Sequence, residues 1–381
     1  MVVDSFEHIN AAPDDFVAGL LSPMSHLMGV FANRVTDILE QRRWWDRLWS
    51  IAEQHEEPVN EDDIDRLYDR VINRPSGRLV EWLLVSINAR TADSKVLKTD
   101  RLRLRRVAAS RTNAGLLGCG ALTHNAGYTL AVDWRAGLCH LRARLDDHGF
   151  EGIALRAVLL GGAQLGYSAT RAFKSQLIRS VCECRFDGQM NVVAASRLVH
   201  PLIHWEANAS GSKPPVLASE VRNVFEKAPL SVLAGAAECF RKWIPHIGTS
   251  PAEAWETHLS RLFDEIWPSE IRFRHASVSE ELVELCVSTG ASFVQAFDQI
   301  RPYLVPLTNG VSAVYVLAQT QIPEKSPVQC LEMLWLVLGP GAIGKSTELP
   351  NVLDRIATSA PRLCVDRRLQ WLEQHRAVRF E

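Results

Sequence analysis

The chain has 381 residues, a formal net charge of −2 and a hydrophobic content of 47%. This length allows one long core or two domains, and the charge gives no general attraction to nucleic acid or to an anionic membrane. No apolar run approaches the ~18 residues that a membrane span needs, and the N-terminus lacks the pattern of a secretory signal. The eight cysteines are scattered without a disulfide or zinc framework, so we expect a cytoplasmic protein with reduced thiols.

The first predicted elements are helices. In residues 16–39 and 63–71 the apolar side chains fit a helical period better than strict alternation. Residues 73–77 are then expected to form a turn that enters a helix at Arg78. In that turn proline fixes one backbone angle, and Gly77 is expected to supply an angle that other residues resist.

The strongest charge feature is a set of five closely spaced arginines: Arg101, Arg103, Arg105, Arg106 and Arg111. On a helix they would spread over much of the circumference. One hypothesis is that they contact nucleic-acid phosphates. The other, which the negative net charge favours, is that they pair with acidic loops such as residues 61–65.

No segment supplies a recognisable catalytic or metal-binding set. The small residues of Gly115–Gly120 lack a dinucleotide-binding pattern and indicate close helix packing. Cys182 and Cys184 lack the two-residue spacer of redox or zinc pairs. His200 and His204 have a zinc-compatible spacing but no further ligands. We therefore predict no catalytic residue, no cofactor and no metal, although a site assembled from distant residues stays open.

The clearest break in the chain is residues 207–216, which are small, polar or proline and typical of an exposed loop or hinge. It separates an N-terminal helical part, 1–206, from a C-terminal helical part, 217–381. The alternative is one continuous stack through both parts.

The second half is also predicted to be helical. Ser250 and Glu253 form a capping box, as do Ser277 and Glu280. The best strand candidate, residues 311–317, also fits a helix, and one short run cannot build a sheet. Short helices joined by short turns, without a fixed repeat period, predict an all-α fold: an irregular HEAT-like solenoid of antiparallel helix pairs.

A full match to the phosphate-binding P-loop consensus spans residues 339–346. A P-loop needs a strand before it, but Ser326, Pro327 and the apolar spacing up to Leu338 predict a helix there. We therefore interpret the motif as a helix–turn–helix connection. Its residues are judged a look-alike and not a nucleotide site: Gly339, Gly344, Lys345 and Ser346.

Residues 71–84 read Val-Ile-Asn-Arg-Pro-Ser-Gly-Arg-Leu-Val-Glu-Trp-Leu-Leu. This segment resembles a signature of the helical C-terminal regions of bacterial sirtuin-like antiphage defence proteins. Other matching pieces are 44–49, 130–134, 266–268, 278–282, Gly290, Phe293 and 366–368. In that family a separate sirtuin-like domain hydrolyses NAD. Its nucleotide-binding glycines and catalytic Asn–His pair have no counterpart here, so the resemblance implies a scaffold or sensor part.

The resemblance implies a helical scaffold or sensor in antiphage defence, and the lack of a recognisable catalytic set predicts that it is non-catalytic. It would act through protein contacts with an effector domain or with a phage protein. One alternative is a nucleic-acid-binding scaffold that uses Arg101 to Arg111, and a weaker one is a nucleotide-binding protein that uses Lys345.

Overall fold

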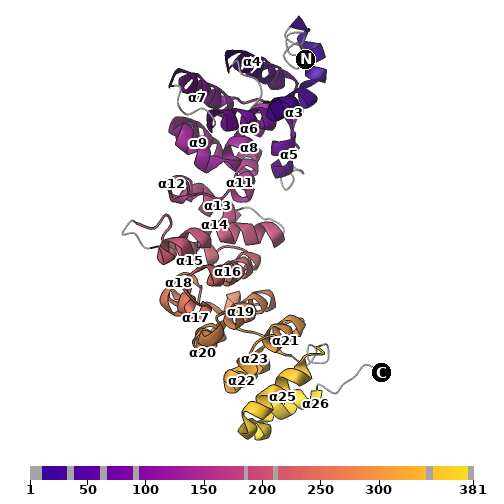
Figure 1. The fold of residues 1–381 in the computed structure, drawn as a ribbon, viewed down its shortest axis with the longest axis vertical. Helices are drawn as coiled ribbons and strands as arrows, with labels where there is room; N and C mark the ends of the chain where they lie inside the picture. The colour runs from indigo at the N-terminus through magenta and orange to yellow at the C-terminus, as the bar shows by residue number, and fades with distance from the viewer. Residues whose placement is uncertain are drawn as a thin grey trace. The chain divides into compact units, whose positions relative to one another are not determined.

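The computed structural model describes residues 11–31, 38–60, 67–88, 94–183, 188–208, 213–339 and 346–375, and within these ranges every regular element is a helix (Figure 1). The predicted all-α class is confirmed. The strand candidate at residues 311–317 is the helix α21, Val311–Ala318. Among the described residues, no helix has both the length and the apolar content that crossing a bilayer requires.

The chain divides into two compact units, Met1–Cys184 and Arg185–Glu381. The boundary lies before the predicted hinge at residues 207–216, of which 209–212 lie outside the described ranges. The physical reason is helix α14, Gly188–Ala207, which packs along α16, Leu230–Trp243. Residues 188–206 therefore belong with the C-terminal part.

In the first unit one row of helices forms the centre, and each member packs on the next. This row comprises α3 (Leu21–Phe31), α6 (Pro75–Asn88), α8 (Asn113–His124), α11 (Phe150–Gly161) and α13 (Lys174–Glu183) (Figure 1). The other helices of the unit are α2 (Asp14–Gly19), α4 (Ile38–His55), α5 (Leu67–Asn73), α7 (Ser94–Ala109), α9 (Ala126–Val132), the π-helix η2 (Ala136–Leu141), α10 (Arg142–Leu145) and α12 (Tyr167–Ala172).

The second unit repeats this plan with the row α14, α16, α19 (Ala276–Ser288), α21 and α25 (Leu349–Ser359) (Figure 1). Its other helices are α15 (Ala218–Phe225), α17 (Pro251–Glu253), α18 (Ser260–Ile266), α20 (Phe293–Ile300), α22 (Ile322–Lys325), α23 (Pro327–Val337) and α26 (Arg367–His375). Short 3-10 or π turns complete it: η3 (Ile244–His246), η4 (Ala254–Leu259), η5 (Ile271–Phe273), η6 (Gly290–Ser292), η7 (Arg301–Tyr303) and η8 (Pro361–Val365).

Local sequence signals set several helix starts. Ser250 caps α17, because its hydroxyl accepts a hydrogen bond from the backbone N–H of Glu253. The second predicted capping box is wrong in detail. Helix α19 begins at Ala276, and its cap is His275, whose ring nitrogen accepts from the Ser277 N–H at 3.3 Å. A histidine cap is not among the usual capping residues, so the sequence pattern pointed to Ser277 instead.

The small residues of α8 let helices approach closely, as predicted. A Cβ atom on Gly118 would lie 2.7 Å from the ring of Trp49, and one on Gly120 would lie 2.3 Å from Val71. Trp49 is fully buried and stacks on Trp45 at 5.5 Å between ring centroids. A larger side chain in this part of α8 would therefore push apart the core of the first unit.

The turn predicted at residues 73–77 is wrong. Helix α5 ends at Asn73 and α6 already begins at Pro75, because proline is as well suited to the first helical position as to a turn. Gly77 lies in the first turn of α6, and among the described residues only Gly248 and Gly290 have a positive φ. What Gly77 provides is space, since its Cβ would lie 1.4 Å from the carbonyl oxygen of Val71.

Candidate functional site

Four arginines of the predicted basic run lie on α7, and neighbouring elements bind each of them. Arg101 donates from Nε to the carbonyl oxygen of Val132 at 2.8 Å. Arg105 makes a two-pronged contact with Asp133, with hydrogen bonds of 2.6 and 3.1 Å. Both contacts hold the end of α9 against α7.

Arg103 belongs to a charged network between α4 and α7. Its guanidinium donates to Asp46 at 2.6 and 2.9 Å and to Asp100 at 3.0 Å. Asp100 also accepts from Arg42 at 2.5 Å, and the side chains of this second pair are buried. The Arg42 guanidinium in turn lies 5.0 Å from the ring centre of Trp82.

The last two arginines of the run are more exposed but are also paired. Arg106 donates to Glu53 at 2.6 Å and Arg111 to Glu151 at 3.1 Å. The predicted partners, residues 61–65, lie outside the described part of the chain. The observed partners come instead from α4, α11 and the end of α9, so each of the four arginines other than Arg101 already has a carboxylate partner. The nucleic-acid interpretation stays a prediction, and within the described part of the chain the charges of Arg103, Arg105, Arg106 and Arg111 are paired with carboxylates.

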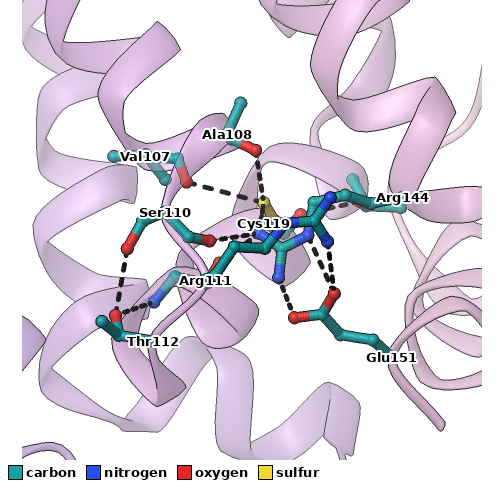
Figure 2. A network of polar contacts seen from close by, with 10 residues as sticks. Val107, Ala108, Ser110, Arg111, Thr112, Cys119, Arg144 and Glu151 are labelled. Atoms are coloured by element: carbon teal, nitrogen blue, oxygen red, sulfur yellow. Dashed lines mark hydrogen bonds and ion pairs between the residues drawn. The ribbon is translucent and has the colours of Figure 1, made fainter.

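Glu151 also anchors a buried cysteine site that the sequence did not indicate (Figure 2). Arg144 is buried and donates to Glu151, to the Ser110 carbonyl oxygen at 2.9 Å and to the Cys119 Sγ at 2.7 Å. Burial raises the pKa of the Cys119 thiol to about 11 and outweighs the charge of Arg144, which lowers it. The thiol is therefore protonated at neutral pH, which makes it a packing and hydrogen-bonding group and not a nucleophile.

His200 and His204 of α14 are brought together against an aromatic ring. His200 stacks on Trp243 at 4.4 Å between ring centroids, and His204 meets the same ring edge-on at 6.3 Å. Burial, together with the nearby His204 and Arg197, lowers the pKa of His200 to about 4. Among the described residues no three His, Cys, Asp or Glu side chains form a group that could hold a metal ion.

The P-loop look-alike lies between two helices. The helix predicted before it is confirmed as α23, which ends at Val337, and α25 follows at Leu349. Gly339 and Ser346 are described, whereas Gly344 and Lys345 lie outside the described residues. A working P-loop follows a strand of a sheet, and here a helix takes that place.

A hollow in the first unit was not singled out as a site by sequence reasoning. It has a volume of about 410 Å³ and lies between α6 and the junction of α8 with α9. Its lining residues are Glu81, Leu84, Val85, Asn125 and Tyr128. In the sequence, Glu81, Leu84 and Val85 are spaced at i, i+3 and i+4, which places them on one face of a helix. This spacing was the signal that could have indicated one wall of the hollow.

The polar groups of this hollow are held in place by the backbone around them. The Tyr128 hydroxyl donates to the Leu84 carbonyl oxygen at 3.2 Å, and the Asn125 amide donates to the Ala121 carbonyl oxygen at 3.1 Å. Burial raises the pKa of Glu81 and outweighs the opposing charge of Arg78. The arrangement is a half-buried acid in a small cavity, which suits binding more than it suits any complete catalytic set.

Comparison with known proteins gives a match along nearly the whole chain. The chain is 27% identical over 380 residues to a protein of Sinorhizobium fredii (strain NBRC 101917 / NGR234) whose printed name is "Uncharacterized protein y4cA". The match covers 98% of this chain and 31% of that protein, so the chain spans about a third of the length of its relative. No family model matches the chain, and no solved structure does.

Proposed function

We propose that this chain is a non-catalytic scaffold or sensor of antiphage defence that binds a protein, either an effector domain or a component of the invader. In this proposal the rows of helices in each unit are parts of an irregular HEAT-like solenoid. Such stacks present extended surfaces, and their function is to hold a partner.

The observation that carries the proposal is the surface formed by α7 and the end of α9. Leu102, which is 54% exposed, lies on α7 between Arg101 and Arg105. These two arginines bind Val132 and Asp133, the residues directly before Trp134 (56% exposed). An exposed tryptophan and leucine beside arginines that are already bound suit a protein interface better than a phosphate backbone.

The length of the relative also supports the proposal. A chain that spans 31% of a longer protein fits a region that works on other domains of the same polypeptide or on an associated effector. NAD hydrolysis, which the resemblance assigns to a separate sirtuin-like domain, would then lie outside these residues.

Affinity capture from phage-infected and uninfected cells, with nuclease present throughout, tests the proposal. We expect one protein to be recovered in stoichiometric amount with the wild-type chain, and to be lost with Trp134→Glu. Ile271→Glu also replaces an exposed apolar side chain with glutamate, at a 75% exposed position of the other unit, and serves as the matched control. A parallel capture without nuclease that recovers nucleic acid and no protein partner would favour the nucleic-acid-binding alternative.

A further inference from the structure

The hollow between α6 and the α8–α9 junction contains the Glu81 carboxylate. Within the described part of the chain, no hydrogen bond and no ion pair is made to the Glu81 side chain. Glu81 is nevertheless half-buried. An ionised carboxylate that has lost water without gaining donors is costly, and a ligand that supplies donors and a positive charge removes that cost.

The apolar walls of the hollow match the rest of such a ligand. Leu84 and Val85 line it on the same helix as Glu81, and Val85 is 56% exposed, so the hollow opens to solvent. Arginine and lysine side chains carry an apolar stem below a charged head. The stem would lie along Leu84 and Val85 while the head reaches Glu81.

We infer that this hollow receives an arginine or lysine side chain of the protein partner, whose guanidinium or ammonium group donates to the Glu81 carboxylate. Asn125 and Tyr128 form the polar side of the same hollow. The inference rests on the proposed protein-binding function and names the residue type that would anchor the partner.

Titration calorimetry of the full chain with two capped tripeptides tests the inference. The first is acetyl-Gly-Arg-Gly-amide, and the second carries citrulline, which has nearly the same shape but no charge. For a single side-chain anchor we expect saturable binding of the arginine peptide with a Kd on the order of 1 mM. The citrulline peptide should bind at least about tenfold more weakly, because the charge-assisted hydrogen bond is lost.

Two variants locate the binding. Glu81→Gln should weaken the arginine peptide at least about tenfold, and Glu265→Gln, the same charge change in the other unit, should leave it unchanged. Val85→Arg tests peptide binding in the hollow while the Glu81 carboxylate is kept. It places a guanidinium four residues after Glu81 on an exposed position of α6, where the two can pair and block the hollow.

The outcomes separate this inference from the proposed function. Equal binding of both peptides, or arginine binding that survives both Glu81→Gln and Val85→Arg, would overturn the anchor. So would agmatine, a free guanidinium compound, binding far more tightly than the peptide, because the hollow would then take a small molecule. If the anchor fails while a partner is still captured through Trp134, the scaffold proposal stands without it.

Discussion

Asp100 and Arg42 form an ion pair at 2.5 Å in which the exposed fraction of each side chain is below 5%. The same carboxylate accepts from Arg103, a member of the basic run that the sequence offered as a nucleic-acid site. One buried acid therefore serves two arginines, and the pair joins α4 to α7. This arrangement gives part of the basic run a structural role.

The variant Asp100→Asn tests that role. It removes a carboxylate that pairs with the buried Arg42 guanidinium, and we expect a loss of about 3 kcal/mol in the free energy of unfolding, measured by urea denaturation. Asp46→Asn removes the other, 44% exposed partner of Arg103 and should cost less than about 1 kcal/mol. Equal effects of the two changes would show that burial of Asp100 does not matter.

Gly77 gives a second prediction. In Gly77→Ala the new Cβ meets the Val71 carbonyl oxygen, so α5 and α6 must separate, and we expect a destabilisation of about 2 kcal/mol or more. Gly19→Ala, where a Cβ meets nothing within 4 Å, is the matched control and should be neutral. An unchanged melting temperature for the Gly77 variant would contradict the close approach.

The pKa of His200 predicts a pH dependence. Its folded-state pKa of about 4 lies below the ordinary 6.5, so below pH 6.5 the unfolded state takes up a proton that the folded state does not. This group therefore makes stability fall as the pH is lowered from about 6.5 to about 4. His200→Phe keeps a ring beside Trp243 and removes the titration, and urea denaturation across this range should show a smaller loss of stability. If the free energy of unfolding changed with pH in the variant as it does in the wild type, the pKa of His200 would be the same in the folded and unfolded states.

The P-loop look-alike gives a prediction about nucleotides. Because a helix precedes the motif, we expect no saturable binding of ATP or GTP to the purified chain by calorimetry, and Lys345→Ala should leave the melting temperature unchanged. Binding of ATP that disappears in Lys345→Ala would restore the nucleotide alternative.

The start of a helix could be predicted from the sequence where neighbouring residues determine it. Ser250 and Pro327 begin helices as their sequence contexts indicate, because capping depends on neighbouring backbone atoms. The start of α6 was not predictable, since Pro75 suits a turn as well as a first helical position. The approach of Gly77 to Val71 depends on how two helices cross, which spacing alone does not specify.

The candidate sites could be predicted less well from the sequence than the helices could. The arginines of α7 were identified, but their partners Asp46 and Asp133 lie far away in sequence and reach α7 only through packing. The hollow around Glu81 joins α6 to Asn125 and Tyr128 at the α8–α9 junction, and no short motif contains both sides. Glu81 lies in the segment 71–84, which was read for its family resemblance, and Asn125 lies just after the small-residue stretch Gly115–Gly120, so neither was singled out.

We propose that the chain acts by binding a protein through the surface that contains Leu102 and Trp134. The most direct test of this proposal is the affinity of the purified chain for the captured partner, measured by calorimetry at two salt concentrations. We expect Trp134→Glu to weaken binding at least about tenfold, Ile271→Glu to leave it unchanged, and salt to have a small effect, unlike phosphate recognition. An affinity that is unchanged in Trp134→Glu and falls steeply as the salt concentration rises would contradict this proposal.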